Sequence, residues 1–393
     1  MSVAVAPSPA GVRLAQLPPL ALYVHIPWCV RKCSYCDFNS HQAKGDVPER
    51  AYVEALVTDL ELALPDVWGR RVYSVFFGGG TPSLFSAAAI GTLVSAFRAR
   101  LPLAADCEIS MEANPGTFEA EKFRGYREAG VNRLSIGIQS FNPEHLKALG
   151  RIHDDGEARR AIEIAKASFE NINLDLMYAL PGQTPGEART DVQAALEAGT
   201  AHLSFYHLTI EPNTLFHRHP PKLPEEDTAA EMQDMIIAAL EKGGYVHYET
   251  SAWARPGREC RHNLNYWRFG DYLGIGAGAH SKLSFSDRVT RAMRWKQPKE
   301  YLQRVAEGRP VEESHEVERA DLVFEFMMNA LRLPEGFAVG SFVERTGLQI
   351  AAAEKPLREA ETRGLIVRDH ERIRPTDLGQ RFLNDLLQLF LPR

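Results

Sequence analysis

Three cysteines with a spacing suited to metal chemistry stand near the start of the chain. A CX3CX2C motif directly follows the apolar run Leu20–Val24, and its thiols are Cys29, Cys33 and Cys36. Thiolates are the soft ligands that select iron–sulfur clusters, and a four-iron cluster normally takes four of them. Three ligands on one short loop leave one iron free to bind a small molecule. The spacing therefore predicts a [4Fe–4S] cluster with an open iron.

Two other interpretations of these cysteines are a structural zinc site and thiols that are simply buried. Structural zinc prefers four protein ligands, and no fourth Cys or His stands at finger spacing, although His25 and His41 flank the loop. The chain has five cysteines, an odd number with three in one loop, which does not suggest a disulfide framework. A cluster needs reduced thiols, so we expect a cytoplasmic protein.

The composition is that of a globular protein with more than one domain. The chain has 393 residues, of which 45% are hydrophobic and 24% charged. A net charge of −6 gives no electrostatic reason to expect nucleic acid as a partner. The first twenty residues lack the basic start and apolar stretch of a secretion signal, and we expect a loose tail there. No apolar run approaches the roughly 20 residues that cross a bilayer, so any membrane contact should be peripheral.

Short β-rich runs alternate with amphipathic helical patterns over the first half of the chain. The predicted strands are Leu22–Ile26, Val72–Phe77, Glu108–Glu112, Arg133–Ile138, Asn173–Met177 and His202–Leu208. The predicted helices between them are Glu49–Leu64, Phe85–Arg100, Glu119–Ala129, Gly156–Ala167 and Pro185–Ala198. This alternation indicates an α/β fold with a parallel sheet, either curved as a partial barrel or laid open as a doubly wound fold.

Unusual polar and glycine residues stand where these strands end. The motif with Cys29 follows the first strand, and the next three strands lead into Gly78–Pro82, Glu112–Pro115 and Gln139–Phe141. Asp175 lies in the fifth strand. Active sites of βα barrels lie at the carboxyl ends of the strands. The pattern therefore favours a barrel with one site to which at least five strands contribute.

The residue types at this site describe a pocket for S-adenosylmethionine. Three glycines expose backbone groups that can receive an amino-acid moiety. Glu112 or Asp175 could accept hydrogen bonds from ribose hydroxyls, and Arg151 could pair with a carboxylate. Taken singly, each has an ordinary interpretation as a tight turn, a helix-capping acid or a solvated arginine. Their common position at the strand ends favours the shared pocket.

The combined motifs resemble radical S-adenosylmethionine proteins, in the branch that contains oxygen-independent coproporphyrinogen III oxidases and HemW haem chaperones. The likeness covers nearly the whole chain and includes Tyr23–Pro27, Gly79–Ser83, Glu112–Pro115, Gly137–Phe141 and Leu149–Arg151. It implies a partial (β/α)6 barrel and a cluster held by the three loop cysteines. The S-adenosylmethionine positions that it implies are Tyr23, Gly79, Gly80, Thr81, Glu112, Gln139, Arg151 and Asp175.

Two features separate this chain from the oxidases of the branch. The oxidases carry a further Cys two residues after the third cluster ligand, where this chain has Phe38, and they begin with a longer N-terminal extension. Downstream, the segment His262–Trp267 matches the HNXXYW signature of the haem chaperones. The resemblance thus implies a haem chaperone that passes haem to respiratory-chain proteins. The alternative is a coproporphyrinogen III oxidase of porphyrin biosynthesis, so whether the chain is an enzyme stays open.

The HNXXYW segment can also be interpreted from its residue types. His262 offers an imidazole to haem iron, Tyr266 and Trp267 offer flat apolar faces, and Cys260 is a second candidate ligand. The ordinary alternative is a turn packed by aromatic side chains, with the histidine in a hydrogen bond. The glycine-rich run Gly274–His280 is weak evidence for a dinucleotide site, and we expect it to form the far wall of the pocket.

The C-terminal part has the pattern of a winged-helix-like α+β module. Its predicted helices are Leu322–Leu331, Ser341–Thr346, Glu354–Arg363 and Gly379–Phe390, and its predicted strands are Gly364–Arg368 and Ile373–Thr376. Acids are mixed with the bases, which favours a lid or a protein-docking surface over DNA binding. We expect a tail over residues 1–20, the barrel over 21–215, an extension with the HNXXYW segment over 216–320 and this module over 321–393. Whether the chain forms a homodimer stays open.

Overall fold

A twelve-stranded sheet dominates the computed structural model, which describes residues 12–117 and 119–392. Seven neighbouring strands of this sheet run parallel, in the spatial order β11 (Asp271–Ile275), β1 (Leu20–Ile26), β4 (Val72–Gly79), β5 (Leu103–Ala113), β6 (Arg133–Gln139), β7 (Ile172–Tyr178) and β8 (His202–His207). Six of them are the strands expected from the sequence. The seventh, β11, was not expected, because its five residues include a glycine that weakens the strand pattern.

Antiparallel strands extend the sheet on both sides and leave it open. Beyond β11 come β12 (His280–Ser284), β13 (Val289–Arg294) and β14 (Val311–Glu316). Beyond β8 come β10 (Ala252–Ala254) and β9 (Val246–Glu249). The spatial order ends at β14 on one side and at β9 on the other. The α/β sheet is therefore a partial barrel that does not close on itself.

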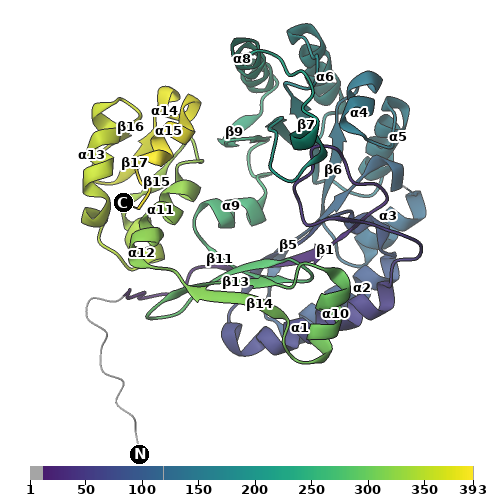
Figure 1. Cartoon of the computed structure of the whole chain (residues 1–393), viewed down its shortest axis with the longest axis horizontal. Coiled ribbons are helices and arrows are strands. Elements are labelled where there is room, and N and C mark those ends of the chain that lie inside the picture. The colour runs from purple at the N-terminus through teal and green to yellow at the C-terminus, as the bar shows by residue number, and fades with distance from the viewer. Residues whose placement is uncertain (1–11, 118, 393) are drawn as a thin grey trace, which may run out of the picture.

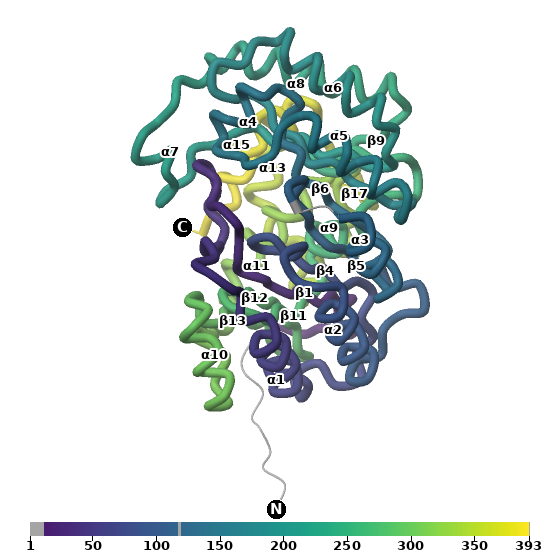
Figure 2. The backbone as a smooth tube through the Cα atoms, turned by 90° about the vertical axis from the view of Figure 1, so that its right-hand side faces the viewer, coloured from purple at the N-terminus to yellow at the C-terminus, as the bar shows by residue number. Residues whose placement is uncertain are grey.

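Helices cover the outer side of the parallel strands (Figure 1). Those expected from the sequence are α1 (Glu49–Val67), α2 (Ala87–Arg100), α3 (Ala120–Glu128), α5 (Asp155–Lys166) and α6 (Pro185–Ala198). Figure 2 shows α1 and α2 side by side beneath the strands. Their ends follow local signals: in α6, Thr184 and Glu187 form a capping box, Pro185 takes the first turn and Gly199 ends the helix in a left-handed conformation.

The remaining helices of this region are shorter or follow the barrel. They are α4 (Pro143–Leu149), α7 (Leu215–Arg218), α8 (Glu226–Lys242), α9 (Arg261–Trp267) and α10 (Pro298–Ala306), with 3₁₀ turns at Pro82–Leu84 and Pro115–Thr117. Helix α9 carries the HNXXYW segment and contacts β4, β1 and β11. This helix therefore brings the downstream motif onto the middle of the sheet.

The C-terminal elements form a separate group, at the left of Figure 1. They are α11 (Arg319–Ala330), β15 (Phe337–Ala338), α12 (Val339–Thr346), a 3₁₀ turn (Ile350–Ala353), α13 (Glu354–Thr362), β16 (Ile366–Arg368), β17 (Arg372–Pro375), α14 (Asp377–Arg381) and α15 (Leu383–Gln388). The strands form a small sheet in the order β15, β17, β16. The winged-helix-like pattern is confirmed, with one difference: the expected final helix breaks at Phe382 into α14 and α15.

Two large clusters of buried apolar side chains hold these groups together in the described part of the chain. One fills the space between the barrel strands and their helices, and the other lies in the C-terminal group. Val12 and Leu14 belong to the second cluster, and the Leu14 amide donates to the Ser286 carbonyl at 3.0 Å. Residues 12–19 therefore lie against the fold instead of forming the loose tail expected there, because these two side chains have an apolar surface to cover. Residues 1–11 lie outside the described residues. No described helix is long and apolar enough to cross a membrane.

Candidate functional site

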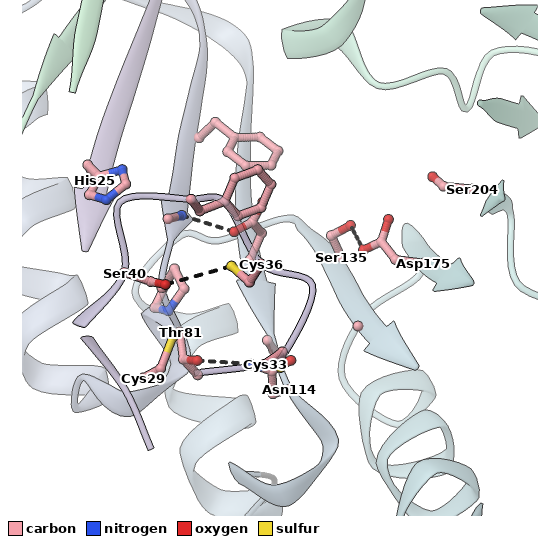
Figure 3. Close-up of a pocket in the computed structure, with 18 of the residues that line it drawn as sticks. His25, Cys29, Cys33, Cys36, Ser40, Thr81, Asn114, Ser135, Asp175 and Ser204 are labelled. Atoms are coloured by element: carbon pink, nitrogen blue, oxygen red, sulfur yellow. Dashed lines mark hydrogen bonds between the residues drawn. The ribbon is translucent and has the colours of Figure 1, made fainter. Parts of the chain in front are cut away.

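The residues that the sequence marks as a site all line one cavity. It has a volume of about 800 Å³ and reaches from the carboxyl ends of the parallel strands to the first residues of β6 and β8. Figure 3 shows the side chains that converge on it from the cysteine loop and from several strands. The expected site residues in its lining are Tyr23, Cys29, Cys33, Cys36, Gly79, Gly80, Thr81, Glu112, Gln139, Arg151, Asp175 and His262.

A short strand pair holds both ends of the cysteine loop. Strand β2 (Trp28–Cys29) pairs with β3 (His41–Gln42), so the loop leaves and returns at the same place. The Cys36 amide donates to the Cys33 carbonyl at 3.3 Å, which makes a tight turn between these two ligands. All three thiols are free of disulfide bonds. The chain therefore presents them together on one wall of the cavity.

The electrostatics of the loop fit a cluster that binds with loss of protons. Burial raises the pKa of both Cys29 and Cys36, so these groups are neutral thiols before a metal binds. Among the described residues, no group of three or more His, Cys, Asp and Glu side chains converges on a point that would hold a single metal ion. A cubane cluster has its irons at separate corners, so its ligands need no such common point.

Arg151 connects the cysteine loop to the strand ends. Its guanidinium donates to the Gly137 carbonyl at 2.6 Å, to Asn114 Oδ1 at 2.5 Å and to Cys33 Sγ at 3.5 Å. The sequence suggested a carboxylate partner for this arginine, whereas its protein partners here are an amide, a carbonyl and a thiol. Asn114, which the sequence reasoning did not single out, also donates to Thr81 Oγ1 at 2.8 Å.

The glycines after β4 allow the strand to approach the cysteine loop closely. Gly79 has φ +117°, and a Cβ there would lie 2.6 Å from the His25 ring. A Cβ on Gly80 would lie 2.5 Å from the Trp28 carbonyl oxygen. The Gly79 amide points into the cavity region and donates to Glu112 Oε2 at 3.1 Å. These positions therefore need glycine for packing as well as for any ligand contact.

Two partly buried carboxyl groups lie near the end of β5 and in the middle of β7. Burial, followed by the nearby Asp175 charge, raises the pKa of Glu112 to about 8. Burial also raises the pKa of Asp175, whose oxygens accept from Ser135 Oγ at 2.7 Å and Asn173 Nδ2 at 2.8 Å. Gln139, at the end of β6, has φ +68°, an uncommon conformation for a non-glycine residue. Such backbone conformations are often found at binding sites.

His262 on α9 lies in the cavity wall with one ring nitrogen held. Its Nδ1 is 3.2 Å from Ser74 Oγ, and its ring stacks on Phe76 with centroids 4.9 Å apart. Burial, followed by the charge of Arg133, lowers the pKa of His262 to about 3. The imidazole is therefore neutral at physiological pH, as a metal ligand must be. Cys260, the other candidate haem ligand, is outside the cavity lining: its thiol is fully buried and donates to Glu108 Oε1 at 3.6 Å.

The glycine-rich run after β11 forms part of the far wall through Gly278 and His280. Its glycines contact the cysteine-loop side of the molecule. A Cβ on Gly276 would lie 2.4 Å from the His25 carbonyl oxygen, and one on Gly278 would lie 2.2 Å from Asn39 Nδ2. The Tyr52 hydroxyl accepts from the Ala277 amide and donates to the His25 carbonyl, both at 2.8 Å. The close backbone approach that the sequence suggested is thus made to the protein.

Several cavity residues escaped the sequence reasoning. They are buried polar side chains in the first half of parallel strands, namely Arg133, Asn173, His202 and Ser204. Parallel strands covered on both faces normally read as continuous apolar runs. A polar residue inside such a run is therefore the signal that could have identified them.

Comparison with known proteins identifies the family to which this fold and site belong. The model of the radical SAM superfamily matches residues 23–195, and that of the HemN C-terminal domain matches residues 317–382. A solved structure of coproporphyrinogen III oxidase (HemN) from Escherichia coli superposes with a TM-score of 0.81 at 26% identity, covering 95% of this chain and 90% of that one. Fold and cysteine loop together define a radical SAM protein of the HemN-like type.

Proteins with similar sequences narrow the family assignment. The chain is 50% identical over 380 residues to heme chaperone HemW of Escherichia coli strain K12, covering 96% of this chain and 100% of the relative. It is 47% identical over 384 residues to heme chaperone HemW of Haemophilus influenzae, covering 96% and 99%. The chain belongs to the HemW family, which confirms the resemblance seen in its motifs.

Proposed function

We propose that this protein is a haem chaperone that binds haem, carries a [4Fe–4S] cluster with S-adenosylmethionine, and delivers haem to respiratory-chain proteins. The observation that carries the haem assignment is the apolar rim of the cavity. Large hydrophobic side chains in the cavity lining are unusually exposed, and they are Val30, Phe38, Ile152, Tyr206 and Tyr266. Exposed apolar groups gathered around one opening mark a binding surface. A flat apolar macrocycle would cover them, and the named HemW relatives support this choice of ligand.

The residues for the cluster and S-adenosylmethionine follow from the cavity wall. The three loop cysteines would hold the cluster, and Arg151 donates a hydrogen bond to Cys33 Sγ at 3.5 Å. Tyr23, Gln139, Glu112 and Asp175, with the Gly79–Thr81 segment, would bind S-adenosylmethionine. When bound, a cluster with an open iron supplies one-electron reduction of S-adenosylmethionine. The chain itself supplies the orientation and a buried, water-poor wall.

His262 is the proposed haem ligand on the opposite wall. A ligating histidine usually directs its second ring nitrogen to a fixed partner, which sets the tautomer and the ring orientation. Ser74 Oγ can accept a hydrogen bond from Nδ1–H, which leaves the Nε2 lone pair for iron. Stacking on Phe76 holds the ring plane. The pair formed by Ser74 and His262 therefore has the arrangement that a haem ligand needs.

A second candidate function is the oxygen-independent oxidation of coproporphyrinogen III, because the HemN structure shares the fold over nearly the whole chain. The second position after the third cluster cysteine argues against this oxidation. Phe38 stands there with its side chain 59% exposed at the cavity rim, and a phenyl ring cannot replace the thiol that the oxidases carry.

One experiment separates the two functions on a single sample. Protein purified anaerobically would be titrated with haem and then incubated with coproporphyrinogen III, S-adenosylmethionine and a reductant. We expect saturable haem binding and no protoporphyrinogen. Turnover of coproporphyrinogen III without saturable haem binding would establish the oxidase instead.

The location and partners of the protein are part of the same proposal. A chain that keeps five free thiols and a cluster fits the reducing cytoplasm. Delivery to respiratory proteins would then require at most peripheral contact with the membrane. The division into residues 1–20, 21–215, 216–320 and 321–393 is our proposed domain organisation, and self-association would be tested by light scattering. We propose no nucleic-acid partner.

A further inference from the structure

Arg133 is a buried cation that the proposed cofactor sites do not use. It begins β6, its side chain is 2% exposed, and it lines the cavity. Its Nε–H has no hydrogen-bond partner, and within the part of the chain that the structure describes its guanidinium forms no ion pair. Burying a charge without hydrogen-bonding partners is costly, so an arginine in this state indicates a polar ligand.

The acids around Arg133 balance its charge without satisfying its donors. Glu108 Oε1 already accepts from the amide of His262 at 3.3 Å and from the thiol of Cys260 at 3.6 Å. Both oxygens of Asp175 are taken by Ser135 and Asn173. These carboxylates lie near enough to interact with the arginine through space. None of these carboxylates forms a direct hydrogen bond with the Arg133 guanidinium.

The other buried arginine of the cavity provides a contrast. Arg151 donates to Gly137, Asn114 and Cys33, so its donors have protein acceptors. Next to Arg133, the imidazole of His202 is bound by Asn173 and by the Tyr248 hydroxyl, and burial lowers its pKa well below the usual range. That imidazole is therefore neutral and already paired. Arg133 is left as the charged donor group available to a ligand at this end of the cavity.

We propose that Arg133 binds a carboxylate of the cavity ligand, and that in the haem complex this carboxylate is a haem propionate. A planar guanidinium matches a carboxylate with two parallel hydrogen bonds. Haem combines the apolar macrocycle that suits the cavity rim with two acidic arms. Arg133 also lies close enough to His262 for its charge to act on that imidazole, so both contacts belong to the same wall. This inference rests on the proposed haem function. The carboxylate of S-adenosylmethionine is the other source of the same chemistry.

The test compares haem with haem dimethyl ester, whose propionates carry no charge. Both would be titrated into the wild-type protein and into the Arg133→Gln variant, with the affinities read from the Soret band. We expect the wild type to bind haem about 10–100-fold more tightly than the ester, the effect of one charge-assisted pair. The variant should bind both equally. Arg124→Gln, at an exposed position on α3, is the matched control and should keep the preference.

The outcomes separate this inference from the function on which it rests. Equal binding of haem and ester by the wild type would overturn the role of Arg133 while leaving the haem function intact, and it needs no variant that might misfold. A parallel titration with S-adenosylmethionine should give the same affinity for wild type and Arg133→Gln. Loss of that affinity, with the haem preference kept, would overturn the propionate assignment in favour of the other carboxylate. No saturable binding of either porphyrin would overturn the haem function itself.

Discussion

Replacing Glu112 by Gln should stabilise the ligand-free protein, and the gain should grow with pH. The carboxyl group is buried beside Asp175, and its pKa lies at about 8, compared with an ordinary value of 4.5. Because the folded protein binds this proton more tightly than the unfolded chain, its contribution to stability is fully present below pH 4.5. It is lost as the pH rises through 8. Glutamine keeps an oxygen for the Gly79 amide and has no proton to lose.

The size of this gain follows from the two pKa values. Once the pH exceeds the pKa of the unfolded chain, each further pH unit up to the pKa of the folded protein adds about 1.4 kcal/mol to the difference. The free energy of unfolding of Glu112→Gln should therefore exceed that of the wild type by about 1 kcal/mol at pH 5, about 3 kcal/mol at pH 7 and about 5 kcal/mol at pH 9. Buried groups that do not interact with Glu112 titrate in both proteins and cancel from the difference, whereas Asp175 interacts with Glu112.

Urea unfolding at these three pH values, followed by tryptophan fluorescence, would measure the difference. Glu187→Gln is a suitable control. Glu187 is partly exposed, and its hydrogen bonds in the capping box lower its pKa, so this change should destabilise the protein at neutral pH. A gain for Glu112→Gln that does not change between pH 5 and pH 9 would refute the argument that Glu112 is protonated in the ligand-free cavity.

Three further predictions concern the proposed ligands. Replacing any one of the three loop cysteines by Ala should abolish the brown chromophore and the bound iron after anaerobic reconstitution, whereas Cys107→Ala should keep both; stoichiometric zinc without iron would contradict this. Arg151→Ala should weaken S-adenosylmethionine binding by about 1.5–3 kcal/mol while the cluster remains, and unchanged isothermal titration would count against it. Ser74→Ala removes the partner of His262 Nδ1 and should weaken haem binding about tenfold, measured at the Soret band. Ser281→Ala, at a buried serine outside the cavity lining, is its control.

Much of the barrel could be predicted because its signals are local. Alternation of strand and helix patterns, with capping residues such as Thr184, marks each element within a few residues. The rule that barrel sites lie at the carboxyl ends of strands then gathered the site residues from separate segments. The cysteine loop, Glu112 and Asp175 could be assigned to one cavity on this basis alone.

The rest depends on contacts between distant parts of the chain. Ser74 and His262 are 188 residues apart, and no local pattern indicates that they meet. The packing of Val12 and Leu14 on the C-terminal cluster is equally remote in sequence. Arg133 was included in a predicted strand, but the missing hydrogen-bond partner of its Nε–H only becomes visible once the neighbouring strands are placed.

The position of β1 in the sheet has a consequence for the durability of the proposed cluster site. This strand leads into the cysteine loop and lies between β11 and β4, with several further strands on each side. Local opening of a sheet begins at its margins, where fewer hydrogen bonds must break. The amides of β1 should therefore be among the slowest to exchange with deuterium, while β9 and β14 exchange early. The start of the cysteine loop should therefore stay fixed while the outer strands open locally, so that the three thiols keep their positions.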